Sequence, residues 1–351
     1  MDLDSRTQTL AQDDFARLEF SDYRDVPSED RWTSVRERID EESQQLFAFG
    51  TDRLVRAQGY ILSEREVAIV LSVHHVVCDG YGIFVLLDDW SNLYSNRRGA
   101  SRTLFETQSY LDFLSKNDDW VKSNVSPLVK EQLLPLYKNV LRTLDIGAVL
   151  RYTSAHGAPV TLLENGSEFL GKRIGDELGP NPLKALKKLG QAGGATLFMT
   201  LLTAWQALMA HANGYQDFSL VVPMAARSYP GMDKVVANCV NLIPVQFHAE
   251  PDMKFAYLLN QIKTFMGSIY GVMDYPNREL VLDLRAAGKI ESATEVPWNT
   301  TFNLEPAQKM AKFETVPVQL VSFPVRSVEF PFMMNITEVS GFLRIDIDIQ
   351  L

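Results

Sequence analysis

The sequence predicts a mixed α/β or α+β protein in two lobes. Its 351 residues suggest about two domains, at roughly 150 residues each. Helix-spaced and strand-like apolar segments occur in both halves of the chain. Turn signals cluster between residues 145 and 165, so we predict an N-terminal lobe over residues 1–150 and a C-terminal lobe over residues 151–351.

The first lobe is predicted to carry one strong strand followed by a helix. Residues 67–73 form a nearly continuous β-branched run, which favours a strand buried on both faces. Residues 81–94 repeat apolar side chains at helix spacing. The lobe is also expected to hold a short strand and a surface helix (29–42) near its start, and helices at 104–114 and 129–144.

The second lobe alternates predicted helices and strands. We expect helices at 181–189, 197–212 and 255–270, and strands at 218–222, 240–247 and 343–351. The last strand alternates strictly, which predicts one buried face and one polar, mostly charged outer face. The uncharged run at 197–210 is shorter than the about 20 residues of a membrane span, so a buried helix is favoured.

Composition argues against several classes of partner. Asp and Glu (44) outnumber Lys and Arg (34), and a net charge of −10 disfavours a general affinity for nucleic acid or anionic membranes. Cys78 and Cys239 are too few and too distant for a disulfide framework or a zinc set, which fits a reducing cytoplasm. The polar start lacks the apolar core of a signal peptide. We therefore expect a cytoplasmic protein with no nucleic-acid or membrane partner.

One string carries the chemistry, His74-His75-Val-Val-Cys-Asp79-Gly80. It stands where the predicted strand ends and the next helix begins, so a rigid strand holds side chains that can face a cleft. Imidazole titrates near neutrality and can accept a proton from an attacking nucleophile. Neighbours at a strand end point to opposite sides, so one histidine can face a cleft while the other packs. Asp79 is expected to turn the chain, and Gly80 to permit a close or strained backbone.

Plainer interpretations of these residues stay open. His74 alone is more simply explained as a packed, hydrogen-bonded side chain, and Asp79 as a helix N-cap. No metal site is predicted, because the other three histidines lie in unrelated segments: His156, His211 and His248. The sequence has no Gly-x-Ser-x-Gly elbow, phosphate loop or Gly-x-Gly-x-x-Gly, so we expect chemistry without a bound cofactor.

The histidine string resembles the signature of the condensation domains of nonribosomal peptide synthetases, which is shared with chloramphenicol acetyltransferase and related acyltransferases. The resemblance extends along most of the chain. Similar motifs are Phe49-x-x-x-x-Leu54-Val-Arg56, Tyr110-Leu-Asp112-Phe113, the stretch from Ala195 to Asp217, Val222-Pro-Met-Ala-Ala-Arg227, Val240-Asn241-Leu-Ile-Pro244 and Asp274-Tyr-Pro276. The stretch over residues 195–244 favours condensation domains over the shorter acetyltransferases.

The resemblance implies a two-layer sandwich fold in two acetyltransferase-like lobes, arranged as a V-shaped pseudo-dimer with a tunnel between them. It implies acyl or peptidyl carrier domains as partners, with substrates as thioesters on their phosphopantetheine arms, and adenylation or ketosynthase modules as further partners. No bound cofactor, no metal and a monomeric state are expected.

The same resemblance assigns roles to residues. His75 acts as general base or positions the acceptor amine, with His74 in support. Asp79 is structural and pairs with Arg227, beside Gly80. Tyr81 and Asn241 are implied to contact substrate. On the residues alone, Arg227 also fits a surface position at a strand end, and Asn241 an ordinary turn or edge-strand amide.

The sequence thus predicts an amide-forming condensation acyltransferase in natural-product biosynthesis. Two alternatives stay open. One is a free-standing acyltransferase that takes acyl-CoA and transfers to an alcohol or amine. The other is a catalytically silent docking module of the same fold, although such a module has no need of His75 and Asp79.

Overall fold

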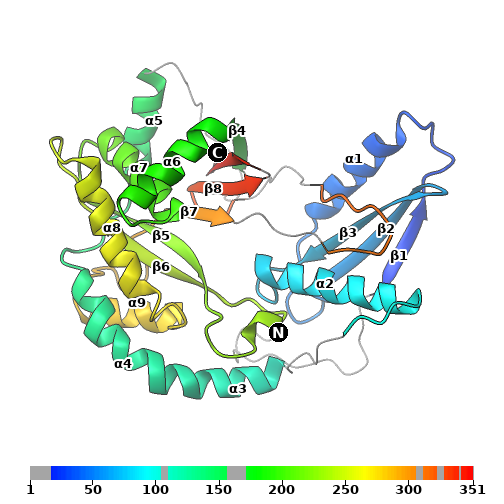
Figure 1. Ribbon diagram of the computed structural model, residues 1–351, viewed down its shortest axis with the longest axis horizontal. Helices are drawn as coiled ribbons and strands as arrows, with labels where there is room; N and C mark the ends of the chain where they lie inside the picture. The colour runs from blue at the N-terminus through cyan, green and yellow to red at the C-terminus, as the bar shows by residue number, and fades with distance from the viewer. Residues whose placement is uncertain are drawn as a thin grey trace. The chain divides into compact units, whose positions relative to one another are not determined.

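The structure is a computed structural model that describes residues 17–103, 110–155, 171–305, 311–321, 328–339 and 341–350 (Figure 1). The chain divides into two compact units. Unit 1 runs to Ile83 and includes Val236–Asn238, and unit 2 is formed by Phe84–Val235 and Cys239–Leu351. The division into lobes at residue 150 stays a prediction. Residue 150 lies inside helix α5 (Ile146–Ala155), so part of the stretch interpreted as turns is helical.

Unit 1 is built on a three-stranded sheet in the order β1-β2-β3. Strand β1 (Leu18–Asp22) runs parallel to β2 (Val55–Ser63), and β2 runs antiparallel to β3 (Glu66–Val73). Helix α1 (Arg31–Ser43) packs on β2 and buries Val35 and Ile39. The predicted strand before the histidine string and the helix near residues 29–42 are therefore confirmed.

The predicted burial of β3 on both faces is wrong. Val67 and Ile69 are 46% and 41% exposed. Strand β3 is an edge strand, and α1 covers the face that carries Tyr60, whose hydroxyl donates to Glu42 on that helix. Ala68 is paired with Tyr60, so Val67 and Ile69 alternate to the opposite face. The β-branched run therefore predicted the strand correctly, but not its burial, because only one face of the strand is covered.

Unit 2 is built on a six-stranded mixed sheet in the order β4-β9-β8-β7-β5-β6. Its strands are β4 (Gly171–Leu178), β5 (Phe218–Ala225), β6 (Val240–Phe247), β7 (Thr300–Glu305), β8 (Phe332–Val339) and β9 (Phe342–Gln350). Strands β5, β7 and β8 run parallel in the middle, and the outer pairs are antiparallel.

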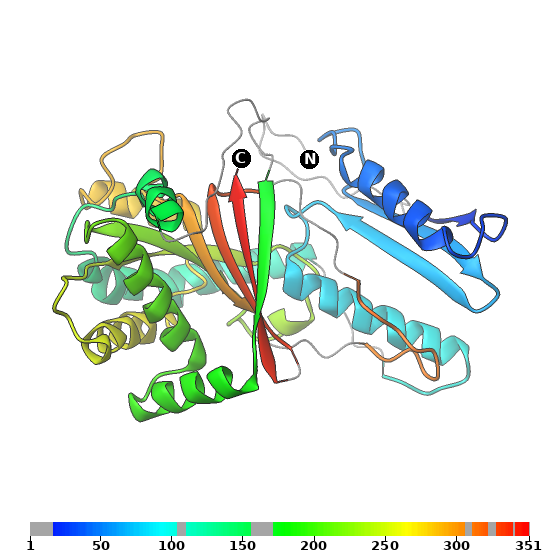
Figure 2. The ribbon, with the colours of Figure 1, turned by 90° about the horizontal axis from the view of Figure 1, so that it is seen from above.

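Helices cover one side of this sheet, which gives the unit two layers. Figure 2 shows α6 (Pro180–Ala192), α7 (Leu197–Ala212) and α8 (Phe255–Ile269) on the same side. The main core lies between the layers and includes Leu202, Leu220, Val245, Ile262 and Phe302. Helix α9 (Asn277–Ala286) packs near β6.

Helix α7 is confirmed with the predicted bounds. Thr196 caps its start by accepting a hydrogen bond from the Met199 amide at 3.2 Å, and ten of its sixteen residues are buried. No single helix among the described residues is long and apolar enough to cross a membrane. Helices α6 and α7 pass that test only when they are counted together across a 99° bend.

The predicted helix over 129–144 is wrong in its second half. A helical run passes through α3 (Tyr110–Trp120), α4 (Ser126–Leu128) and wide π-type turns, and it ends at Leu136. The chain then runs irregularly beside other segments: the Leu141 amide donates to Lys289 at 2.9 Å, and the Ser219 amide donates to Arg142 at 2.7 Å. The buried residues here imitate helix spacing: Tyr137, Leu141 and Leu144. Periodicity alone therefore misassigned a buried irregular segment.

The predicted charged outer face of the last strand is exposed only in part. Arg344 is exposed, whereas Asp346 and Asp348 on the same face of β9 are buried beside side chains of the neighbouring strands β4 and β8. The Arg173 guanidinium donates to both Asp348 oxygens at 2.7 and 2.8 Å, and Asn335 donates to the same carboxylate at 3.0 Å. Asp348 is therefore a buried but fully bonded charge.

Candidate active site

The histidine loop, residues 74–79, joins β3 to helix α2 (Gly80–Arg97). Main-chain hydrogen bonds hold both of its ends. The His74 amide donates to the Leu54 carbonyl at 2.9 Å, and the Asp79 amide donates to the Ala237 carbonyl at 3.2 Å. Inside the loop, the Val77 amide donates back to His74 at 3.1 Å. The loop is thus fixed between the start of β2 and a segment far along the chain.

The two histidines have opposite surroundings. His75 is exposed, whereas His74 is partly buried against the rings of Phe47 and Phe49. The Val76 amide donates to Nδ1 of His74 at 3.1 Å. The structure therefore packs His74, as the plainer interpretation proposed, and leaves the His75 imidazole accessible to a reactant.

Asp79 is a buried helix cap. Its side chain is buried (1% residue exposure), and Oδ1 accepts a hydrogen bond from the Gly82 amide at 2.7 Å, in the first turn of α2. This contact satisfies one of the amides that a helix start leaves unpaired.

The expected constraint at Gly80 is found instead at Gly82. Gly80 has no positive φ, and a Cβ built there meets nothing within 4 Å among the described residues. A Cβ on Gly82 would approach the Cys78 sulfur at 2.7 Å and the Ala237 oxygen at 3.2 Å. The expectation of a close backbone at Gly80 is therefore wrong. Sequence reasoning missed Gly82, although its place three residues after a capping Asp could have indicated it.

The predicted residues of the second half lie in unit 2. Arg227 follows β5, is partly buried, and donates through Nη1 to the carbonyls of Met232 and Val235, both at 2.8 Å. Asn241 lies on edge strand β6 and donates to the Met273 carbonyl at 2.9 Å. Tyr81, in the first turn of α2, belongs to unit 1 and is 42% exposed.

A further buried acid links these second-half segments. Asp274 is nearly inaccessible, and its Oδ1 accepts a hydrogen bond from the Ser228 amide at 3.0 Å. Since Met273 is the partner of Asn241, residues 273 and 274 together hold the segments that carry Arg227 and Asn241. The side chains of the Tyr110-Leu-Asp112-Phe113 motif, and residue His156, lie outside the described residues.

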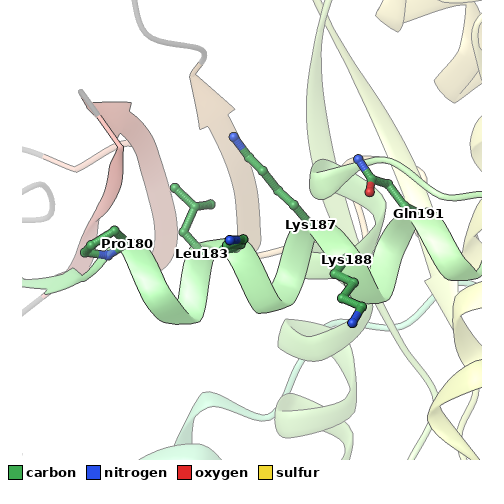
Figure 3. Close-up of a pocket in the computed structure, with 6 residues that line it drawn as sticks. Pro180, Leu183, Lys187, Lys188 and Gln191 are labelled. Carbon is green, nitrogen blue, oxygen red and sulfur yellow. The ribbon is translucent and has the colours of Figure 1, made fainter.

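A hollow along helix α6 is unrelated to these residues. It measures about 460 Å³ and is lined by Pro180, Leu183, Lys184, Lys187, Lys188 and Gln191 (Figure 3). Lys187 is paired with Glu338 on β8, with 2.6 Å between Nζ and Oε1. The hollow contains no predicted site residue. Over the described part of the chain, no group of three or more His, Cys, Asp or Glu side chains could hold a metal ion.

Comparison with known proteins identifies the family. The family model described as the condensation domain matches residues 3–126 and 159–350. This chain therefore belongs to the condensation domain family, whose members in nonribosomal peptide synthetases are acyltransferases that form amide bonds. The predicted family and class of enzyme are confirmed.

The curated relatives are large synthetases. A plipastatin synthase subunit of Bacillus subtilis (strain 168) is 23% identical over 326 residues, which are 90% of this chain and 12% of that protein. Malpinin synthetase of Mortierella alpina is 25% identical over 266 residues, 75% of this chain and 3% of that protein. The chain thus spans only a small part of each.

Solved condensation domains share the fold. The first condensation domain of the calcium-dependent antibiotic synthetase has a TM-score of 0.68 at 17% identity, covering 95% of this chain and 70% of that one. VibH, a condensation enzyme of nonribosomal peptide synthesis, has a TM-score of 0.69 at 15% identity, covering 96% of this chain and 74% of that one. The predicted mixed α/β fold class is confirmed, while the V-shaped arrangement of lobes stays a prediction.

Proposed function

We propose that this chain joins a carrier-bound thioester donor to an acceptor amine. The amine nitrogen attacks the thioester carbonyl, a C–N bond forms, the C–S bond breaks, and the amine proton ends on the released thiol of the phosphopantetheine arm. The observation that carries this proposal is the exposed imidazole of His75 on a loop fixed at both ends, in a chain of the condensation family. Alignment of two reactants can supply several kcal/mol of the barrier reduction.

His75 has one of two roles in this reaction. It accepts the amine proton as a general base, or it hydrogen-bonds and positions the amine while the tetrahedral intermediate forms. An accessible imidazole held by a rigid loop serves either role. Asp79 supports the loop as cap and, in our proposal, as the ion-pair partner of Arg227. Tyr81 and Asn241 are proposed to contact substrate.

The proposed partners follow from the proposed substrates. Donor and acceptor arrive on the phosphopantetheine arms of carrier domains, which dock on a monomeric condensation domain. Adenylation or ketosynthase modules load or extend those carriers. The curated relatives are multidomain synthetases, which supports a chain that works beside such domains.

The direct test is mass spectrometry of acyl transfer. The chain is mixed with a loaded donor carrier and an aminoacyl acceptor carrier, and in parallel with acyl-CoA and free amines or alcohols. We expect amide product from the carriers, and a loss of about 100-fold or more in His75→Ala, the usual scale for removing a general acid–base group. His211→Gln, at an exposed histidine on α7, is the matched control and should keep the wild-type rate.

Other outcomes of this test would select the alternatives. Transfer from acyl-CoA but not from carriers would make the chain a free-standing acyltransferase. Product at the wild-type rate from His75→Ala would remove His75 from the mechanism. Carrier binding without any transfer would favour a docking module.

A further inference from the structure

A second loop packs on the histidine loop within unit 1. We call residues 45–52, which precede β2, the aromatic loop. Its Phe47 and Phe49 rings meet the His74 ring edge to face, with centroid separations of 5.7 and 4.8 Å and interplanar angles of 82° and 67°. Aromatic pairs prefer this geometry. The two phenyl rings therefore restrict rotation of the His74 imidazole.

Arg56 of β2 fixes the aromatic loop from behind. Its guanidinium lies 4.0 Å from the centre of the Phe47 ring, in a cation–π contact. The same group donates to the carbonyls of Gln45 and Leu46, both at 3.0 Å, and to the Asp52 carboxylate at 3.1 Å. The planar guanidinium carries several N–H donors in a fixed arrangement, so it can make the ring contact and these hydrogen bonds together, whereas a lysine ammonium could not.

The His74 ring has one neutral tautomer that fits these contacts. Because Nδ1 accepts the Val76 amide hydrogen, Nδ1 carries no proton, and the proton of the neutral ring sits on Nε2. Rotation or a change of tautomer would break that hydrogen bond. The bond spans the His75 residue, so the state of the His74 ring sets the backbone from which His75 projects.

We propose that Phe47, Phe49 and Arg56 are positioning residues, which hold His74 in its Nε2–H form and thereby aim His75. They touch no reacting atom. The effect on amide formation rests on the proposed function, but the effect on His74 does not. We call Phe47, Phe49 and Arg56 together the clamp, since they hold the packed His74 and thereby orient the exposed His75.

The first experiment tests the effect of the clamp on the His74 ring and needs no measurement of catalysis. The full chain is labelled with ¹⁵N in its histidine rings, and NMR reports which His74 nitrogen is protonated. We expect Nδ1 of His74 to be unprotonated in the wild-type chain and to exchange between forms in Phe49→Leu. Leu46→Ala, at a 91% exposed position in the same loop, should match the wild type. Phe49→Tyr keeps the ring and should restore the wild-type spectrum, and an unchanged spectrum in Phe49→Leu would overturn the proposal.

The second experiment measures amide formation with loaded carriers. We expect Phe49→Leu and Arg56→Lys to lower kcat about 10- to 100-fold with the KM values for both carriers unchanged, and Phe49→Tyr to recover most of kcat. If kcat falls only in proportion to the fraction of folded protein, and the His74 spectrum is unchanged, then the aromatic loop has a structural role and no positioning role. If the wild type makes no amide, the proposed function fails and the spectrum alone decides the clamp.

Discussion

At the residue scale, the carboxylate of Asp79 and the lack of a side chain at Gly82 together shape the start of α2. Asp79 reaches the Gly82 amide at 2.7 Å, which is possible because Gly82 leaves space beside the Cys78 sulfur. Gly80 faces open space in the same turn. Of these two glycines, only Gly82 therefore has a steric reason within the fold to lack a side chain.

Alanine at each position tests this difference. We expect Gly82→Ala to lower the free energy of unfolding by about 1–3 kcal/mol, the usual cost of overpacking. Gly80→Ala should leave stability within about 1 kcal/mol, since its Cβ meets nothing nearby. Urea unfolding of both variants is the measurement. Equal losses at the two sites would contradict the assignment, and a slower amide formation in stable Gly80→Ala would place substrate close to that backbone.

At the element scale, an ion pair closes one end of the β5–β6 hairpin. The Nδ1 atom of His248 lies 2.6 Å from Asp217 Oδ1, just beyond the paired residues Phe218 and Phe247. The hydrogen bond to the Asp217 carboxylate raises the pKa of the His248 imidazole, with Glu250 adding to the effect. The hairpin end is thereby more stable when His248 is charged.

This pair predicts a pH-dependent stability with a definite sign. Since the folded pKa is raised, the contribution is complete below the unfolded value of about 6.5 and is lost as pH rises through the folded pKa. The ring is half exposed, so we expect only about 0.5 kcal/mol. Urea unfolding at pH 5.5 and 8.5 should show this difference in the wild type and not in His248→Gln. His211→Gln is the control, and an identical pH dependence in His248→Gln would contradict the assignment.

The elements that sequence reasoning predicted share a simple pattern. Helix α7 and strand β6 were placed with their observed bounds because both segments are mostly apolar and contain no Asp, Glu, Lys or Arg. Strands β2 and β4 were missed, because Gly, Arg, Gln or charged residues interrupt their alternation. The wrong helix over 137–144 arose because buried residues in an irregular segment happened to fall at helix spacing. Local patterns report which residues are buried, whereas the partner segment decides their backbone shape.

In the candidate site, too, some features could be predicted from the sequence and others could not. The histidine string, with its exposed and its packed member, was predictable, because it combines a strand end with alternation of side chains. The aromatic loop was not, although Phe49 and Arg56 were quoted for their resemblance to the family. In our proposal Phe49 acts through its ring contact with His74, 25 residues later, and Arg56 acts through Phe47, and no local pattern encodes these contacts. The same holds for the main-chain contact between Asp79 and Ala237.

At the scale of the whole molecule, the ion pair of Asp79 with Arg227 stays a prediction. Its test must separate the ion pair from the helix cap. Asp79→Asn serves this purpose, because asparagine caps helices as well as aspartate but carries no charge. Arg227→Gln removes the other partner.

We expect strong non-additivity in this cycle. The double variant Asp79→Asn with Arg227→Gln should lose less stability than the sum of the single variants, by about 0.5–3 kcal/mol, because each single change strands a charge. Thermal unfolding and amide formation are measured in parallel. Arg278→Gln, at an exposed arginine on α9, replaces Arg227→Gln in the control cycle and should be additive with Asp79→Asn. Additive losses in the first cycle would count against the pair.

The main-chain bond from Asp79 to Ala237 has a consequence for biosynthesis. The ribosome adds residue 237 about 160 residues after residue 79, which takes roughly 10–30 s at ordinary rates of translation. During that interval the nascent histidine loop lacks one of its two anchors. The geometry of the proposed site is therefore completed late in synthesis, and a chain terminated before residue 237 would contain both histidines with only one end of their loop anchored.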